Sequence, residues 1–196
     1  MFEGLLECTF FLKIMNVLLS TKDKLIITTL NKSFRKYKFK FTYDEYYVCN
    51  NKCRKKWYFN QLTNVRIRNS MIPNRAVHLE FDNNFSENFA GDVVIPNSVT
   101  HLIFDGNFIP KIIDKVSKNV ISVKFCRRFD TNIIEQLSDS IMFIELPLYC
   151  QQKISKLPKC LKILICSEYF YVNNLKLISE REHSEYLATK MIIKFK

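Results

Sequence analysis

Two cysteines early in the chain have a spacing that suits metal chemistry. Cys49 and Cys53 are separated by three residues, which makes them one half of a zinc site. A zinc ion needs four ligands, and no second Cys or His pair follows at ligand spacing. The seven cysteines are an odd number without the spacing of a disulfide framework. We therefore expect reduced thiols in a surface loop, a cytoplasmic location, and neither a metal nor another cofactor.

Two histidines and two aspartates recur at equal separation. His78 and His101 lie 23 residues apart, and so do Asp82 and Asp105. Paired imidazoles can hold a metal ion, and paired carboxylates can exchange protons. A simpler interpretation is that the same residue recurs because the same structure recurs. The histidines then form a ladder on a sheet, and the aspartates accept hydrogen bonds from backbone donors in successive turns.

No set of nucleophile, base and orienting group stands beside these residues. The sequence has no glycine-rich phosphate loop, no GxSxG, no HExxH and no kinase signature. We therefore expect no catalytic residues and no enzyme activity.

The elements that must position these side chains are copies of one repeat. Residues 72–85 (IPNRAVHLEFDNNF) and 95–108 (IPNSVTHLIFDGNF) agree at nine of fourteen positions. Residues 116–129, 137–150 and 157–170 keep the apolar pattern L-x-x-L-x-L, at steps of 20 to 23 residues. Self-similarity at such a period is typical of stacked repeat proteins.

The repeat pattern predicts a parallel sheet with one buried face. The x-L-x-L part of each copy has period two, as a half-buried strand does. Stacked copies bury their apolar side chains in columns. One predicted column contains Leu79, Leu102, Val123, Ile144 and Leu164. The return segments are too short for long helices and each carries one buried apolar residue, namely Phe89, Ile112, Ile133 and Ile154.

Prolines mark the turn that enters several of these strands. Pro73, Pro96 and Pro158 cannot donate to a ladder and precede the strand. Ser117 and Ser138 replace the proline in the third and fourth copies, so those turns are free to differ.

The flanking segments predict two caps. Ile67 is expected in a leading strand, residues 190–195 (KMIIKF) in another strand, and residues 179–186 in an exposed helix. Near the amino terminus, Ser20 followed by Asp23 is an N-cap signal. The apolar side of the helix before it contains Leu6, Phe10, Ile14, Val17 and Leu18.

The predicted fold is therefore α+β with four parts. Residues 1–50 form a short helical module, and residues 51–71 form a connection with a cap strand. Residues 72–170 form a β-solenoid of five repeat units with a parallel sheet. Residues 171–196 form a carboxy-terminal cap.

The formal charge of +11 is unevenly distributed. Residues 1–60 hold 12 Lys and Arg against 5 Asp and Glu, whereas residues 61–170 hold 13 against 11. Most of the excess lies between residues 32 and 56. It is either a solvated surface that maintains solubility or a patch for weak, unspecific contact with nucleic acid phosphates. The apolar stretch of residues 5–19 is too short and too interrupted to span a membrane.

The repeats resemble FNIP repeats, a relative of leucine-rich repeats that is abundant in social amoebae and in giant viruses of amoebae. The resemblance covers about residues 64–170 and is carried by the two IPNxxxHLxFDxNF strings. Residues 107–110 (NFIP) come near the motif that names the family. The resemblance implies a leucine-rich-repeat-like solenoid that binds another protein, in the host cytoplasm if the source is viral.

The amino-terminal residues resemble a degenerate F-box, the helical module that docks on the Skp-type adaptor of cullin-RING ubiquitin ligases. The resemblance is carried by residues 11–15 (FLKIM), 18–25 (LLSTKDKL) and 30–35 (LNKSFR), whereas Leu5-Leu6 stands where the family has Leu-Pro. It implies an adaptor-binding ridge of Leu12, Met15 and Leu19. The alternative is a helical segment that only caps the solenoid.

If a target binds the solenoid, the side chains between the core leucines should contact it, because they point away from the core. These are His78, Glu80, Asp82, His101, Ile103, Asp105, Lys124, Phe143, Glu145, Ile163 and Ile165. Ile103, Phe143, Ile163 and Ile165 form an apolar strip. That strip is either a partner site or a surface covered by the carboxy-terminal segment or a second subunit. The chain is thus either a ubiquitin-ligase substrate receptor or a stand-alone interaction protein, with nucleic-acid binding a weaker third interpretation.

Overall fold

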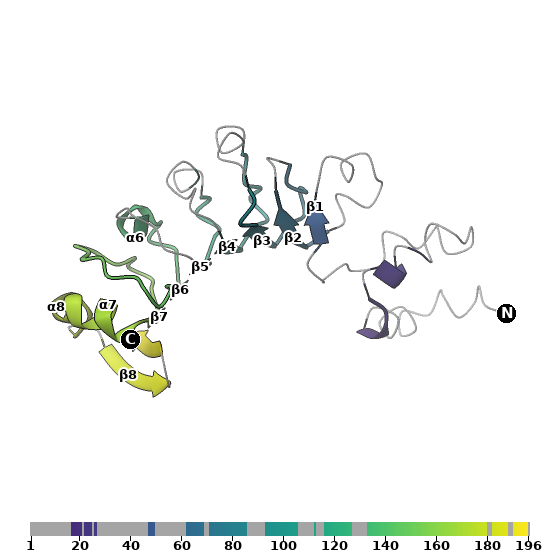
Figure 1. Ribbon diagram of the computed structural model, residues 1–196. Coiled ribbons are helices and arrows are strands. Elements are labelled where there is room, and N and C mark those ends of the chain that lie inside the picture. Colours follow the sequence, from purple (N-terminus) through teal and green to yellow (C-terminus); the bar gives the residue numbers. More distant parts are fainter. Residues whose placement is uncertain are drawn as a thin grey trace.

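The computed structural model describes residues 17–20, 22–24, 26, 47–49, 62–68, 71–85, 93–105, 112, 116–126, 133–179, 182–187 and 190–195. Its main feature is a nine-stranded sheet in the order β1-β2-β3-β4-β5-β6-β7-β9-β8. The strands are β1 (Tyr47–Cys49), β2 (Asn64–Ile67), β3 (His78–Phe81), β4 (His101–Phe104), β5 (Ser122–Phe125), β6 (Phe143–Glu145), β7 (Ile163–Cys166), β8 (Glu182–Leu187) and β9 (Lys190–Phe195). The sheet follows the inner side of an arc, and the described parts of the return segments lie on its outer side (Figure 1).

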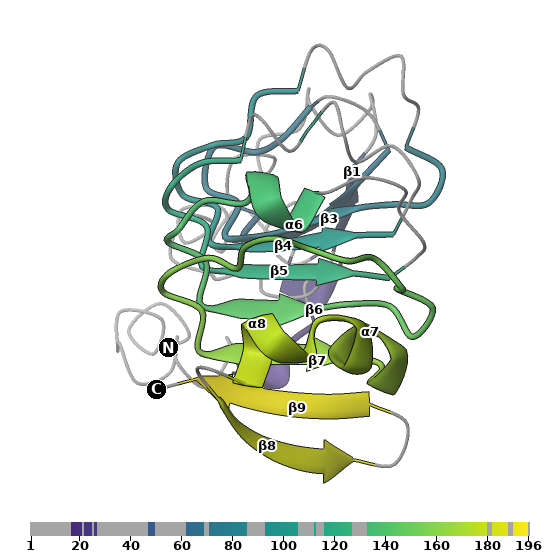
Figure 2. The same cartoon turned by 90° about the vertical axis from the view of Figure 1, so that its left-hand side faces the viewer.

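Strands β1 to β7 are parallel to one another, and each pairs with the next along the chain. The four pairings from β3 to β7 wind the chain into a β-solenoid of about four turns. Figure 2 shows these strands as successive rungs, with β9 and β8 continuing the sheet beyond β7. Where the backs of the turns are described, they hold short helices, which are α6 (Ile133–Gln136), α7 (Glu168–Asn173) and α8 (Leu175–Ser179).

The predicted buried column is confirmed. Leu79, Leu102, Val123, Ile144 and Leu164 pair in one unbroken register, and all five are buried. Val65 on β2 and Ile193 on β9 continue the column at its two ends. The strands therefore share one core because the period-two pattern keeps the same phase in every turn.

Aromatic rings form a second buried column beside the first. Phe81 and Phe104 stack with their ring centroids 5.2 Å apart, and Phe104 and Phe125 stack at 5.5 Å. Phe85 contacts the edge of this column, with its ring perpendicular to Phe81 at 5.2 Å. Each ring is packed between neighbours in the adjacent turns, so packing between turns is the main source of stability.

The same entry turn precedes β3, β4, β5, β6 and β7, whether proline or serine begins it. The backbone N–H of Ala76 donates to the carbonyl of Pro73 at 3.0 Å, and Val120 donates to Ser117 at the same distance. Ile141 donates to Ser138 at 3.1 Å. The expectation that the serine turns differ is therefore wrong. A serine hydroxyl accepts from the backbone N–H two residues later, at 3.2 Å from Asn119 and 3.3 Å from Ser140, and so favours the same bend as proline.

Polar side chains also tie each turn to the one before it. The hydroxyl of Ser98 donates to the carbonyl oxygen of Ala76 at 2.7 Å. The hydroxyl of Ser140 donates to Val120 at 3.2 Å, and the amide of Asn119 donates to the carbonyl of Asn97 at 2.8 Å. These bonds satisfy backbone carbonyls at the turns, where no sheet ladder is available.

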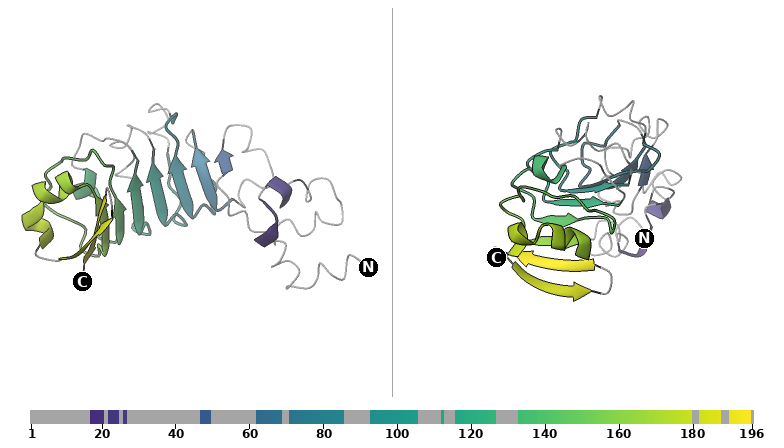
Figure 3. Two further views of the ribbon diagram at one scale, coloured as in Figure 1. Left: turned by 60° about the horizontal axis from the view of Figure 1, so that its bottom comes forward. Right: turned by 60° about the vertical axis from the view of Figure 1, so that its left-hand side comes forward.

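The flanking segments differ in part from expectation. The strands over residues 64–67 and 190–195 are confirmed as β2 and β9. The helix predicted over residues 179–186 is wrong, because β8 occupies residues 182–187 and pairs antiparallel with β9. Pairing with a neighbouring strand outweighs the weak helical preference of a charged segment. Figure 3 shows this hairpin at the end of the sheet opposite β1.

The return segments bury their apolar residues as predicted at Ile112, Ile133 and Ile154. Phe89 lies outside the described residues. Cys49 is buried at the end of β1 and is not in a surface loop, while Cys53 and the basic patch between residues 32 and 56 lie largely outside the described part of the chain.

Candidate functional site: the open face of the sheet

The open face of the sheet carries two rows of side chains, because in-register pairing aligns every second residue. The first row contains Asn64, His78, His101, Ser122, Phe143, Ile163 and Lys194. The second row contains Arg66, Glu80, Ile103, Lys124, Glu145, Ile165 and Ile192. Nine of the eleven predicted target-binding residues lie in these two rows, whereas Asp82 and Asp105 come directly after β3 and β4.

The two histidines of the first row form the predicted ladder. Their ring centroids are 4.3 Å apart, and the ring planes are tilted by 32°. The Nδ1 of His78 donates to the side-chain oxygen of Asn64 at 2.7 Å, because an amide oxygen can only accept. The Nδ1 of His101 lies 2.8 Å from the hydroxyl of Thr100. Burial, and then the charge of His78, lowers the pKa of His101, so this imidazole is neutral near pH 7.

Three ion pairs link neighbouring strands across the same face. Arg66 contacts Glu80 at 2.7 Å, and Lys124 contacts Glu145 at 3.0 Å. The third pair joins Arg68 and Asp82 at 3.4 Å, just beyond the strand ends. These pairs balance three positive charges with three negative ones within the sheet itself.

Two residues that were predicted to contact a target are instead buried. Glu80 and Asp82 are buried, with exposed fractions of 6% and 4%. Burying a carboxylate without a partner is costly. The guanidinium groups of Arg66 and Arg68 supply that partner, and both come from the leading strand, outside the repeats.

Asp82 has the turn role predicted for it. Its Oδ1 accepts from the backbone N–H and the side-chain amide of Asn84, both at 2.9 Å. Burial acts to raise the pKa of Asp82, but the hydrogen bonds from Asn84 and the charge of Arg68 outweigh burial. Its pKa therefore lies below the usual value. Asp105, at the equivalent position after β4, is half-buried.

The apolar strip lies mainly at the carboxy-terminal half of the face. Ile103, Phe143, Ile163 and Ile165 are all half-buried. The carboxy-terminal segment does not lie over them, because β9 pairs with the edge of β7 and so widens the face. Its Ile192 lies beside Ile165 and extends the strip by one strand.

Sequence reasoning missed Arg66, Arg68 and Ile192 as members of this surface. The signal was present in residues 64–68 (NVRIR), where the arginines alternate with the buried Val65 and Ile67. The same alternation in residues 190–195 places Ile192 opposite the buried Met191 and Ile193.

The predicted adaptor-binding ridge is only partly described. Leu12 and Met15 lie outside the described residues, and Leu19 is half-buried. Val17 and Leu18, which were expected to face the core, are 83% and 74% exposed. That expectation is wrong, because the helical turn ends at Leu18 and the chain then bends, so the predicted apolar side does not continue through these residues.

The predicted cap at Ser20 is confirmed by its hydrogen bonds. The Ser20 hydroxyl accepts from the backbone N–H of Asp23 at 3.1 Å and donates to the Asp23 carboxylate at 2.6 Å. The helical residues 22–24 therefore follow a capping serine.

The described part of the chain lacks two kinds of feature. No group of three or more His, Cys, Asp or Glu side chains there is arranged to hold a metal ion. No helix in that part of the chain is both long and apolar enough to cross a membrane.

Comparisons of the whole chain with family models, with curated proteins and with solved structures found no match.

Proposed function

We propose that this chain is a protein-interaction scaffold whose open sheet face holds a partner protein. The observation that carries the proposal is the half-buried strip of Phe143, Ile163, Ile165 and Ile192 on that face. Well-packed aromatic and aliphatic clusters of this kind supply most of the binding energy at protein interfaces. The paired charges around the strip suit a protein surface better than the phosphates of a nucleic acid, which need unpaired cations.

The five copies over residues 72–170 support assignment of the solenoid to the FNIP type. Each copy provides one strand, one column position and the same entry turn. The two IPNxxxHLxFDxNF copies contribute β3 and β4, where the histidine ladder lies.

The test is capture of a partner from host-cell lysate, followed by titration of the purified partner with variants of the face. The double variant Phe143→Thr with Ile165→Thr removes apolar area but keeps β-branched or strand-compatible side chains. We expect it to lose the partner while retaining its melting temperature to within a few degrees. Equal affinity of parent and variant for the partner would exclude this face as the binding site.

We further propose that the amino-terminal segment docks a Skp-type adaptor, which would make the chain a substrate receptor of a ubiquitin ligase. The exposure of Val17 and Leu18 supports this, because apolar side chains beside a capped helical turn are available to a partner. The competing proposal is a stand-alone scaffold whose amino-terminal residues only cap the sheet.

Met15→Glu distinguishes the two proposals, because an unpaired carboxylate buried in an apolar contact costs on the order of several kcal/mol. A variant that melts like the parent but no longer binds purified adaptor supports docking. A variant that unfolds shows that the ridge is internal, and a parent that never binds the adaptor leaves the stand-alone scaffold.

A further inference from the structure

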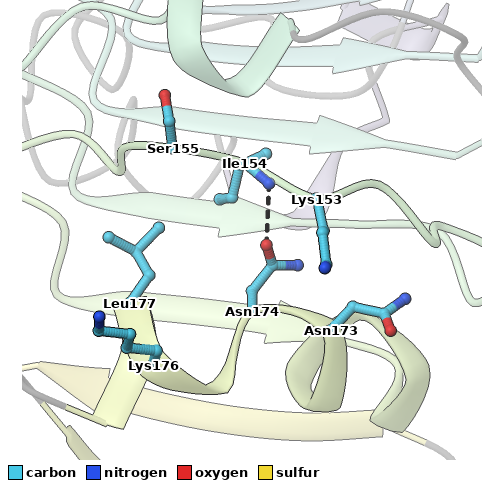
Figure 4. A pocket seen from close by; sticks show the side chains of 7 residues that line it. All are labelled: Lys153, Ile154, Ser155, Asn173, Asn174, Lys176 and Leu177. Atoms are coloured by element: carbon cyan, nitrogen blue, oxygen red, sulfur yellow. Dashed lines mark hydrogen bonds between the residues drawn. The ribbon is translucent and has the colours of Figure 1, made fainter.

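A pocket of about 380 Å³ lies on the outer side of the last solenoid turns, away from the open face. It is bounded by residues 153–155 of a return segment and by the end of α7 and the start of α8 (Figure 4). Ile154 and Leu177 give it apolar walls. Its volume is in the range that holds a small ligand or one or two side chains.

Asn174 fixes the shape of this pocket. Its side-chain oxygen accepts from the backbone N–H of Ile154 at 2.8 Å, the bond drawn in Figure 4. Its side-chain nitrogen donates to the carbonyl oxygens of Gln152 and Phe170, both at 2.8 Å. Asn174 is only 5% exposed, so this buried network holds the return segment and the two helices in one arrangement.

Two lysines flank the pocket from opposite sides. Lys153 comes from the return segment and Lys176 from α8, with Asn174 and Leu177 between them (Figure 4). Neither ammonium group has an acidic partner among the described residues. The nearby Glu135 carboxylate accepts from the backbone N–H of Ser155.

The chain segments that form this pocket also carry several exposed apolar side chains, which we call the rim. Of eleven exposed large hydrophobic side chains among the described residues, five fall within residues 148–175. They are Leu148, Tyr149, Tyr169, Val172 and Leu175, and Tyr149 and Tyr169 are 72% and 70% exposed. Two hydrogen bonds join the two halves of the rim, from Ser167 to the carbonyl of Cys150 at 3.3 Å and from Asn173 to that of Gln151 at 3.2 Å. Exposed apolar side chains concentrated in this way mark an interaction site.

We propose that the pocket and its rim bind an acidic, amphipathic peptide segment of a partner protein. Carboxylates of the peptide pair with Lys153 and Lys176, and its apolar side chains contact Leu177 and the rim. The charge of the surface is complementary to such a segment and to no basic one. The site is separate from the open face, so it neither needs nor tests the proposed function of that face.

The geometry favours a peptide over two other anionic partners. A lipid surface is broad and would contact the projecting rim while leaving the hollow between the lysines empty. Single-stranded nucleic acid binds through a continuous cationic groove that follows its backbone, whereas the pocket has two lysines that come from separate segments.

The test is fluorescence anisotropy with a labelled peptide of alternating glutamate and leucine. We expect saturable binding that weakens at least about tenfold in the double variant Lys153→Glu with Lys176→Glu. The matched control is Lys118→Glu with Lys162→Glu, which makes the same change in net charge at exposed lysines outside the pocket. The control should change the affinity for the peptide less than about threefold, the screened effect of remote charges. Melting curves of all variants check that they are folded.

Four results decide the proposal. An equal loss in the pocket and control variants would show unspecific charge attraction and overturn it. No binding to the parent would overturn it as well. So would a preference for vesicles of anionic phospholipid or for a single-stranded oligonucleotide that depends on the same two lysines. Retained peptide binding in the Phe143→Thr, Ile165→Thr variant supports two separate sites.

Discussion

The two halves of the open face use their side chains in opposite ways. On β2 to β4 the polar groups bind one another, through the pair of Arg66 with Glu80 and the stacked imidazoles of His78 and His101. On β6, β7 and β9 the corresponding positions hold half-buried apolar residues such as Phe143 and Ile165. The first half is satisfied within the sheet, so its residues contribute to holding the strands together. The second half still has apolar area to bury, and a partner gains most by covering it.

Substitutions in the buried core should reduce the unfolding free energy equally in the two halves of the sheet. This loss is the largest effect that we expect. Leu102→Ala and Leu164→Ala should each cost about 2–5 kcal/mol of unfolding free energy. The two costs should be similar, because β9 places Ile193 beside Leu164 and so gives it a neighbour on both sides. Denaturant melts of both variants measure this. A much smaller cost at Leu164 would show that the β8–β9 hairpin packs weakly against the last turn.

Partner binding should distinguish the halves sharply. Phe143→Thr with Ile165→Thr should weaken binding of a captured partner about 100-fold, or about 2.7 kcal/mol. His78→Thr with His101→Thr, the matched change on the first half, should weaken it only a few-fold. Titration by isothermal calorimetry gives both values. The reverse ranking would place recognition on the histidine ladder.

Stability should respond more to the polar groups of the first half. Asp82→Asn keeps the size of the side chain but removes the charge that faces Arg68 and weakens the bonds from Asn84. We expect a loss of about 1–2 kcal/mol, measured by urea unfolding. Lys124→Ala, which breaks the more exposed pair with Glu145, should cost less than about 1 kcal/mol. If the two losses are equal, burial of Asp82 does not strengthen its pairing.

The smallest expected effect is a pH dependence of the unfolding free energy, which comes from titrating residues in the first half. The pKa of His101 is lowered in the folded state, so its contribution to stability is present above the unfolded value of 6.5 and is lost as pH falls through the folded value. Asp82 also has a lowered pKa, and its contribution is lost only well below that range, as pH falls from the unfolded value of 3.8 through the folded value. His101→Gln should remove the loss of stability that begins near pH 6.5 and keep the loss at lower pH that is due to Asp82. Thermal melts across the acid range would contradict this if the loss at higher pH persists in the variant.

The core and its register could be predicted from sequence because each depends on a repeated local pattern. Leu79 and Leu102 occupy the same phase of a period-two segment, and phase alone decides which face is buried. The entry turns were predicted less well, because serine at 117 and 138 has no ring to mark the bend but makes it with its hydroxyl.

The features that could not be predicted from the sequence depend on contacts between segments that are distant in the chain. Nothing near Glu80 in the chain shows that Arg66 of the leading strand will pair with it. The strand at residues 182–187 is set by its pairing with β9. The basic pocket was hidden for a similar reason. Lys153 and Lys176 are 23 residues apart, and a charge count over residues 61–170 balances Lys153 against acids elsewhere and does not include Lys176.

Because the entry turn is the same before each strand, further repeat copies can be added to such a chain. Because proline and serine give the same bend and every turn presents the same two columns, a duplicated stretch of about 20 residues can enter between β4 and β5 without altering either end. Each insertion would lengthen the face by one strand spacing, about 4.8 Å. The number of copies therefore sets the length of the sheet face. The length of partner surface that the face can cover changes by one strand spacing per copy.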